Sequence, residues 1–311
     1  MGKLAFIFPG QGAQKTGMGK DFYETFDSVK EIYDHACEWL GLDMKALCFE
    51  ENEKLDLTEY SQPALVTTCL SMAKVLKDKG IEPDVTAGLS LGEYCAIATA
   101  GAICVQDAIT TVRKRGLLME QAVPAGQGSM AAVLGMTAEE IDQVVDAIQD
   151  VGVANYNCPG QIVITGKKAA VEEASQRLQE AGAKRVIPLN VSGPFHSAML
   201  KEAGEQLAKA LEEVSLNELQ IPYITNVTAE CVEKSQQIKS LLAKQISSPV
   251  KWQQSVETMI ADGVDTFIEI GPGKTLAGFM RKIDRNVKVY NVQTVEDVEN
   301  VLLLTKNRNK Q

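Results

Sequence analysis

The sequence predicts an α/β protein built on a largely parallel sheet. Strand-like and helix-like segments alternate through most of the 311 residues, and this alternation is typical of folds in which helices cover parallel strands. Hydrophobic residues make up 45% of the chain and charged residues 23%, which is the balance of an ordinary globular protein. No internal repeat or low-complexity linker interrupts the pattern. A chain of this length buries a full core, as one large domain or as two.

Glycine and proline mark the ends of several elements in the first and last parts of the chain. A strand over 4–8 ends at Pro9-Gly10, and a helix over 62–80 ends at Gly80. A strand over 266–270 is stopped by Gly271-Pro272-Gly273. The remaining predicted elements here are helices over 28–40, 93–100 and 106–121 and a strand over 83–87, and the polar residues 306–311 are expected to fray.

The middle of the chain follows a different order, which predicts an inserted subdomain. The segments 129–134, 138–148, 153–157, 161–165, 168–181 and 183–189 are expected to form β, α, β, β, α and β elements in turn. This βαββαβ order is the ferredoxin-like pattern. We therefore expect a small subdomain over 128–190, inserted between residues 1–127 and 191–311 of a larger α/β domain.

One motif, Gly88-Leu89-Ser90-Leu91-Gly92, follows a predicted strand and precedes a predicted helix. A sharp strand-to-helix turn of the form G-x-S-x-G is the nucleophile elbow, which exposes its serine hydroxyl above the sheet. Glycines permit close backbone approach and unusual dihedral angles at such a turn. The simpler alternative is a glycine-rich turn that happens to contain a serine. The context on both sides favours Ser90 as a nucleophile.

A serine nucleophile needs a base, and histidine is the usual one. The chain has two histidines. His35 falls within the predicted helix 28–40, where a surface histidine is the simplest interpretation. His196 follows the last strand of the predicted insert, in a loop where catalytic groups tend to concentrate. We expect His196 to be the base, whereas the sequence alone identifies no carboxylate as a third member of the site.

Two further groups fit a site around Ser90. The glycine-rich loop after the first strand contains Gln11, whose main-chain amide could form an oxyanion hole together with the amide of Leu91. Arg115 lies in an otherwise apolar helical stretch beside Arg113 and Lys114, which we expect to be solvated. If Arg115 faces the pocket, its planar guanidinium suits a carboxylate bound through two hydrogen bonds.

Composition argues against several other functions. A formal net charge of −10 disfavours binding to nucleic acid, and no apolar run approaches the roughly 18 residues of a membrane span. The seven cysteines form no C-x-x-C pair, which favours reduced thiols and a cytoplasmic protein. We expect no metal site, because the chain has only two histidines and neither lies at ligand spacing to a cysteine. Gly273-Lys274-Thr275 lacks the first glycine of a Walker motif, and Gly126-Gln127-Gly128 follows a helix rather than a strand, so neither predicts a nucleotide site.

Taken together, the motifs resemble those of malonyl-CoA:acyl carrier protein transacylases of bacterial fatty-acid synthesis. The resemblance covers essentially the whole chain and rests on six ordered motifs: Phe8-Pro9-Gly10-Gln11-Gly12-Ala13-Gln14, Gly88-Leu89-Ser90-Leu91-Gly92-Glu93-Tyr94, Arg115-Gly116, Gly193-Pro194-Phe195-His196-Ser197, Gln245-Ile246-Ser247-Ser248-Pro249-Val250-Lys251-Trp252 and Glu269-Ile270-Gly271-Pro272-Gly273-Lys274.

The resemblance implies an α/β-hydrolase-like core with the ferredoxin-like insert and an active site between them. It implies a malonyl-serine intermediate on Ser90 in a ping-pong transfer from coenzyme A to acyl carrier protein, with His196 as base and no separate cofactor. It further implies that the Gln245 carbonyl orients His196, that Arg115 binds the malonyl carboxylate, and that Phe195 excludes branched acyl groups. Asn155, Asn157 and Gln161 align with residues that contact the pantetheine arm in relatives.

The carrier protein expected from this resemblance is acidic, as is this chain, so docking requires a local basic surface. Arg281 and Lys282, followed by Arg285 and Lys288, form one candidate cluster, and Lys167-Lys168 and Lys184-Arg185 form others on the insert. We expect the protein to act as a monomer.

Three other functions are possible for a chain with this elbow: two are other enzyme activities and one is not enzymatic. A serine esterase or thioesterase would have no reason to hold a cation opposite the serine, and a transacylase for acetyl or longer groups would be expected to lack Arg115. An interaction module with a degenerate site is hard to reconcile with the presence of both Ser90 and His196.

Overall fold

A computed structural model describes residues 2–124 and 126–308. In these residues six strands form the larger sheet in the order β10-β9-β1-β2-β7-β8. All neighbouring strands pair in parallel except β7 and β8, so the predicted parallel α/β architecture is confirmed. The strands are β1 (Lys3–Phe8), β2 (Val85–Gly88), β7 (Tyr223–Ile224), β8 (Cys231–Val232), β9 (Val264–Ile270) and β10 (Lys288–Val292).

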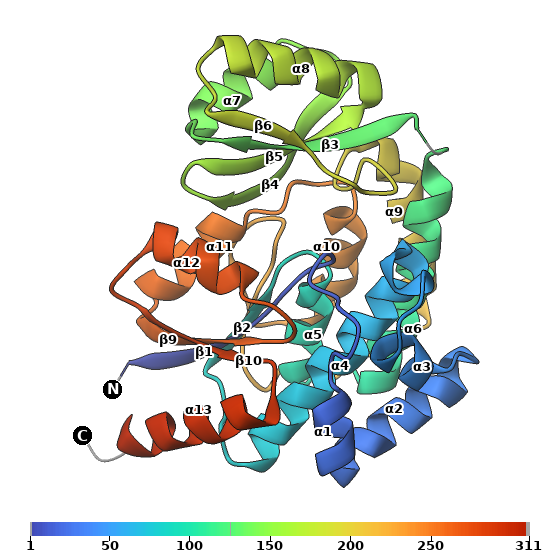
Figure 1. The fold of residues 1–311 in the computed structure, drawn as a ribbon, viewed down its shortest axis with the longest axis vertical. Coiled ribbons are helices and arrows are strands. Elements are labelled where there is room, and N and C mark those ends of the chain that lie inside the picture. Colours follow the sequence, from blue (N-terminus) through green and yellow to red (C-terminus); the bar gives the residue numbers. More distant parts are fainter. Residues whose placement is uncertain (1, 125, 309–311) are drawn as a thin grey trace.

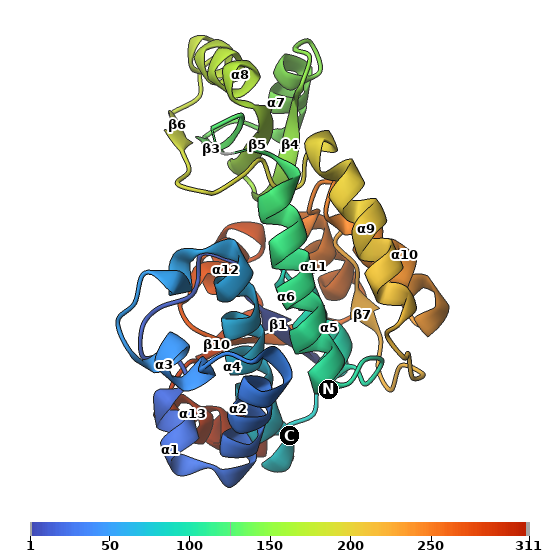
Figure 2. The same cartoon turned by 90° about the vertical axis from the view of Figure 1, so that its right-hand side faces the viewer.

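Helices cover both faces of this sheet (Figures 1 and 2). The longest, α4 (Thr58–Asp78), packs against α6 (Val105–Ala122), and buried side chains line α4 on nearly all sides. The others are α1 (Lys20–Thr25), α2 (Asp27–Leu40), α3 (Met44–Phe49), α5 (Gly92–Thr99), α9 (Lys201–Glu212), α10 (Ile238–Gln245), α11 (Trp252–Ala261), α12 (Thr275–Ile283) and α13 (Val295–Arg308), with short 3₁₀ turns at Lys54–Asp56, Ala198–Leu200 and Ser235–Gln237.

The predicted βαββαβ order of the middle segment is confirmed. Its elements are β3 (Gly128–Leu134), α7 (Ala138–Val145), β4 (Val151–Cys158), β5 (Gln161–Lys167), α8 (Lys168–Glu180) and β6 (Arg185–Pro188). In the described part of the chain they form a separate four-stranded antiparallel sheet of order β4-β5-β3-β6, with α7 and α8 on its outer face (Figure 1). A hydrophobic cluster of its own, which includes Val133, Ile141 and Leu178, holds this sheet to its two helices.

The small sheet meets the rest of the molecule through main-chain hydrogen bonds at β4. Val250 N donates to Ala154 O at 2.8 Å, and Tyr156 N donates to Val250 O at 2.9 Å. These bonds extend the edge of the small sheet onto the segment between α10 and α11, so the inner side of β4 faces the larger sheet. Side chains on β4 can therefore reach a site at the end of β2.

The turn from β2 into α5 has the geometry that the G-x-S-x-G motif predicts, with one difference. A Cβ on Gly88 would lie 1.9 Å from the Gly92 carbonyl carbon, and a Cβ on Gly92 would lie 2.3 Å from the Phe8 carbonyl oxygen. The glycines are therefore required for close approach, as predicted. The unusual dihedral angle belongs to Ser90 itself, whose φ is 51°, a left-handed value that is uncommon for a residue with a side chain.

The structure differs from the sequence-based prediction in three strands and in the C-terminal tail. The strands β7, β8 and β10 were not predicted; β7 and β8 contain two residues each, too few for alternation to be visible. Of the tail expected to fray, residues 306–308 continue α13 and residues 309–311 lie outside the described residues. Within the described ranges, none of the helices has both the length and the apolar character that crossing a membrane requires.

Candidate active site

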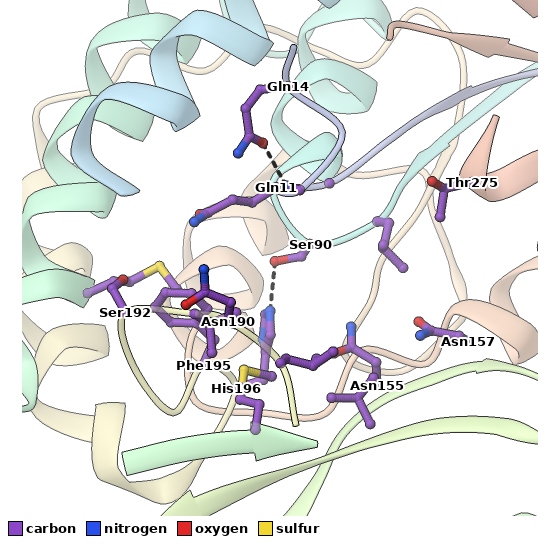
Figure 3. A pocket seen from close by; sticks show the side chains of 18 of the residues that line it. Gln11, Gln14, Ser90, Asn155, Asn157, Asn190, Ser192, Phe195, His196 and Thr275 are labelled. Atoms are coloured by element: carbon purple, nitrogen blue, oxygen red, sulfur yellow. Dashed lines mark hydrogen bonds between the residues drawn. The ribbon is translucent and has the colours of Figure 1, made fainter. Parts of the chain in front are cut away.

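A cavity of about 630 Å³ lies where the two sheets face each other (Figure 3). The loop after β1 contributes Gln11, the elbow contributes Ser90, and α6 contributes Arg115. The small sheet supplies Asn155 and Asn157 from β4, and the segment after β6 supplies Phe195 and His196. Thr275 and Phe279 of α12 form another wall. The cavity therefore gathers residues from distant parts of the sequence around the Ser90 hydroxyl.

Ser90 and His196 are in hydrogen-bond contact. Ser90 Oγ lies 2.7 Å from His196 Nε2, and His196 Nδ1 lies 2.9 Å from the main-chain oxygen of Gln245. Because a carbonyl oxygen can only accept, Nδ1 must carry the proton and donate to Gln245. In the neutral imidazole Nε2 then accepts from the Ser90 hydroxyl. This arrangement points the basic nitrogen at the group that has to lose a proton.

Burial keeps this imidazole neutral. His196 is 4% exposed, and burial, reinforced by the positive charge of Arg115, lowers its pKa to about 4 from the ordinary 6.5, against an opposing contribution from the hydrogen bond to Gln245. A neutral histidine at pH 7 is able to accept a proton. Its backbone φ of 59° is left-handed, like that of Ser90.

Arg115 lies beside the same hydroxyl, buried to 1% exposure. Its Nη2 donates to Ser90 Oγ and to Gln245 Oε1, each at 3.1 Å, and Nη1 donates to Gln62 Oε1 at 3.0 Å. Among the described residues its Nε has no hydrogen-bond partner. A buried cation whose acceptors are all neutral groups favours an incoming anion, and a guanidinium binds a carboxylate through paired hydrogen bonds.

The neighbours of Arg115 in α6 differ from the prediction in one respect. Lys114 is exposed, as expected, but Arg113 is largely covered: it forms an ion pair with Glu59 at 2.6 Å and lies over the Tyr60 ring at 4.4 Å. Its aliphatic stem and planar head pack on α4, which accounts for the loss of exposure.

Gln11 lines the cavity, and Leu91 directly follows Ser90 at the start of α5. Gly12 N and Ala13 N are occupied by Gln14 Oε1 and Gly10 O, and Ser90 N donates to Asn226 Oδ1 at 2.6 Å. Within the described part of the chain, the amides of Gln11 and Leu91 have no such acceptor. Unoccupied N–H groups in the segments next to a nucleophile are what an oxyanion hole requires.

Two buried polar residues of the site, Asn226 and Glu93, were not predicted to have a role. Asn226 accepts from Ser90 N and donates through Nδ2 to Gly88 O at 2.7 Å. Glu93, fully buried, accepts at Oε2 from Asn226 N at 3.1 Å and from Gln245 Nε2 at 2.7 Å. Burial raises the pKa of Glu93 to about 7. Its place one residue after the elbow could have suggested a role, whereas Asn226 lies in a segment without any motif.

The remaining predicted residues fall into two groups. Phe195, Asn155 and Asn157 line the cavity, and Asn157 Oδ1 is buried without a partner among the described residues. Gln161 does not line it. Its side chain is turned to the outside, where Oε1 accepts from Lys282 Nζ at 3.1 Å, because it begins β5 after a Pro-Gly turn. The contact of Gln161 with a pantetheine arm stays a prediction.

The basic residues and the second histidine lie on the surface. Arg281 and Lys282 are exposed in the last turn of α12, the helix that also supplies Thr275 and Phe279 to the cavity wall. His35 is exposed and stacks on Trp39, as the sequence predicts for a surface histidine. In the regions described, no group of three or more His, Cys, Asp or Glu side chains is placed to hold a metal ion.

A serine hydrogen-bonded to a histidine at the end of a parallel strand is the arrangement of acyl-transfer enzymes that use a serine nucleophile. A model of the acyl transferase domain matches residues 5–310, and the chain belongs to this family.

Several proteins of known name are similar to this chain in sequence and in fold over nearly its whole length. A malonyl CoA-acyl carrier protein transacylase of Bacillus subtilis is 48% identical over 99% of this chain and 99% of its own. The crystal structure of a malonyl CoA-acyl carrier protein transacylase from Clostridium perfringens superposes with a TM-score of 0.95 at 43% identity, covering 99% and 98% of the two chains. A malonyl-transacylase in complex with a type II PKS acyl-carrier protein superposes with a TM-score of 0.94 at 37% identity, over 96% and 99%.

The protonation of His196 can be tested directly. In a His35→Gln variant His196 is the one remaining histidine, and its imidazole NMR signals should remain those of the neutral ring as the pH falls from 8 to about 5, because of the lowered pKa. The unfolded chain binds a proton on His196 below about pH 6.5, whereas the folded chain does so only near pH 4. The free energy of unfolding should therefore decrease as the pH falls from about 6.5 to about 4.

The contribution of Arg115 to the lowered pKa of His196 can be tested separately. An Arg115→Met substitution in the His35→Gln background removes the neighbouring positive charge and should move protonation of His196 to higher pH. Protonation of His196 above pH 6 in the parent chain, or an unchanged titration in the Arg115→Met variant, would contradict this account.

Proposed function

We propose that this chain transfers a malonyl group from coenzyme A to the phosphopantetheine thiol of acyl carrier protein, in fatty-acid synthesis. One observation carries the proposal: the buried guanidinium of Arg115 lies 3.1 Å from the Ser90 hydroxyl, which is hydrogen-bonded to His196. Malonyl thioesters have a free carboxylate close to the carbonyl that reacts. The names of the relatives support the same substrate and acceptor.

In the first half of the reaction Ser90 Oγ forms a bond to the thioester carbon, and His196 Nε2 accepts the hydroxyl proton. The amides of Gln11 and Leu91 stabilise the oxygen of the tetrahedral intermediate, at about 3–4 kcal/mol per donor. The carbon–sulfur bond then breaks, and His196 returns the proton to the departing coenzyme A thiolate. The Gln245 carbonyl keeps the ring in the required tautomer throughout.

In the second half the phosphopantetheine thiol of the carrier protein takes the place of coenzyme A. His196 accepts the thiol proton as sulfur attacks the malonyl carbon, and the same proton returns to Ser90 Oγ as the ester breaks. This ping-pong sequence consumes no redox equivalents and requires no cofactor beyond the thioester substrate.

Residues around the hydroxyl account for selectivity. Arg115 binds the malonyl carboxylate, and Phe195 beside His196 leaves little room for a branch next to the thioester. Asn155 and Asn157 border the route by which the pantetheine arm enters, and the unpartnered Asn157 Oδ1 can accept from one of its amide groups.

We further propose that the two sheets correspond to an α/β-hydrolase-like domain, 1–127 and 191–311, and a ferredoxin-like insert, 128–190. The strand order β4-β5-β3-β6 of the small sheet supports the second description.

The monomeric state and the cytoplasmic location stay predictions, as does the expectation that nucleic acid and membranes are not partners. The hydrolase alternative gains no support from a buried cation beside the nucleophile.

The reaction is tested by intact-mass measurement of the full-length chain mixed with malonyl-CoA. A malonyl adduct should form rapidly, be absent in Ser90→Ala, and disappear when carrier protein bearing phosphopantetheine is added. Rapid release of free malonate without any acceptor would instead identify a hydrolase.

The role of Arg115 predicts a change of acyl preference. Arg115→Ala should lower the rate of malonyl loading on the order of 100-fold, because a charge-assisted contact to the carboxylate is lost, while acetyl loading falls less or rises. Single-turnover loading from malonyl-CoA and acetyl-CoA measures both. An unchanged preference would contradict the assignment.

The basic residues at the end of α12 predict a separation of the two half-reactions. Arg281→Glu with Lys282→Glu should slow transfer to acidic carrier protein about tenfold or more at low salt, while loading from malonyl-CoA stays near the parent rate. Lys20→Glu with Lys79→Glu, on α1 and after α4, provides the same charge change far from the cavity. Equal loss in both half-reactions would rule out a docking role for Arg281 and Lys282.

A further inference from the structure

Glu93 is a buried carboxylate that the proposed reaction does not use. It lies in the first turn of α5, has no exposed surface, and makes no hydrogen bond to the Ser90 hydroxyl or to the His196 ring. A carboxylate buried in this way is costly unless its hydrogen bonds are satisfied. Its bonds therefore indicate what it is retained for.

The hydrogen bonds of Glu93 end on Oε2 and come from residues that hold the nucleophile, whereas Oε1 is buried without a hydrogen-bond partner among the described residues. Oε2 accepts from Gln245 Nε2 at 2.7 Å and from Asn226 N at 3.1 Å. Asn226 in turn accepts from Ser90 N, and Gln245 Nε2 also donates to Ser90 O at 2.9 Å. The main-chain groups of Ser90 are thus held by the side chains of Asn226 and Gln245, and both residues also donate to Glu93 Oε2, Asn226 through its main-chain N–H and Gln245 through Nε2.

The orientation of the Gln245 amide is decided by this contact. A carboxylate and the carbonyl of Ser90 are both acceptors, so the amide must turn its NH₂ group toward them. Its oxygen then faces the other way, where Arg115 Nη2 donates to it at 3.1 Å. The opposite orientation would place NH₂ against the guanidinium and an oxygen against two acceptors. Glu93 therefore determines which end of Gln245 meets Arg115.

We propose that Glu93 is a positioning residue for acyl specificity: through Gln245 and Asn226 it fixes the Arg115 guanidinium relative to the Ser90 hydroxyl. The inference rests on the proposed malonyl transfer, since it concerns how Arg115 is held ready for the carboxylate. The same contact steadies the Gln245 main chain, whose oxygen accepts from His196 Nδ1.

Substitutions at this position separate the hydrogen bonds from the charge. Because both donors meet one oxygen, a glutamine in Glu93→Gln can keep both bonds with its single carbonyl while losing the charge. Glu93→Asp keeps the charge but withdraws the acceptor by one methylene. Glu93→Ala removes both. If Gln245 orientation is what matters, the first variant should resemble the parent and the other two should not.

The readout is the ratio of malonyl to acetyl loading on Ser90, measured by intact mass in single turnovers of the full-length chain. Glu93→Ala and Glu93→Asp should lower malonyl loading on the order of 50-fold and acetyl loading much less, so that the ratio falls at least tenfold. Glu93→Gln should keep the ratio within about threefold of the parent. In an Arg115→Ala background, Glu93→Asp should no longer change the ratio.

A matched control is available in Glu269, which is also fully buried. It accepts hydrogen bonds from Leu276 N and Ala277 N at the start of α12 and from Asn291 Nδ2 of β10. Glu269→Ala should lower the melting temperature without changing the malonyl-to-acetyl ratio, as expected for a purely structural carboxylate.

Two results would overturn the inference. A parental ratio in Glu93→Asp and in Glu93→Ala would leave Glu93 with a structural role only. A ratio in Glu93→Gln as low as in Glu93→Asp would mean that the charge, and not the amide orientation, is what Arg115 requires; if Glu93→Ala does not fold, these two variants decide alone. Failure of the parent chain to load malonyl at all would instead refute the proposed function, so the two failures are distinguishable.

Discussion

The burial of the Arg115 cation next to the Ser90 hydroxyl is the constraint on which the rest of the site depends. A guanidinium removed from water loses several kcal/mol of hydration unless acceptors replace it. Here the replacements are the amide oxygens of Gln62 and Gln245 and the hydroxyl itself. None of these carries a charge, so the guanidinium is solvated by dipoles but not neutralised by direct contact. That state suits a site that has to receive an anion.

The fold meets this constraint by bringing four elements to one end of the parallel sheet. The elbow after β2 presents the hydroxyl, α6 presents the cation, the end of α10 supplies Gln245, and the segment after β6 supplies His196. The small sheet closes the remaining side through its main-chain bonds to Val250. Arg115 comes from the interior of a packed helix and Gln245 from the end of another, and groups on such elements are held more precisely than groups on loops.

Much of the architecture could be predicted from the sequence, because hydrophobic periodicity and glycine stops report local structure. Helices such as α4 and α6 and the βαββαβ order of the insert differ from prediction by a few residues at their ends. The strands β7 and β8 are too short to carry a period, so their pairing depends on tertiary contacts alone. The hydrogen bond from Lys282 to Gln161 could not be predicted either, because it joins residues that lie far apart in the sequence.

The site divides in the same way. Ser90 and His196 could be predicted because each is a reactive residue type within a recognisable loop, and the chain has only one other histidine. Asn226 and Glu93 contribute equally direct hydrogen bonds, but asparagine and glutamate are common residues whose partners lie more than a hundred residues away. Their importance follows from burial, which only the folded structure reveals.

The left-handed backbone of Ser90 limits which amino acid can serve as the nucleophile. At a φ of 51°, a side chain branched at Cβ crowds the adjacent carbonyl far more than an unbranched one does. Threonine has the same hydroxyl chemistry as serine and would keep the contact to His196, yet the turn itself disfavours it. The choice between two chemically equivalent alcohols is thus made by the main chain, before any substrate is encountered.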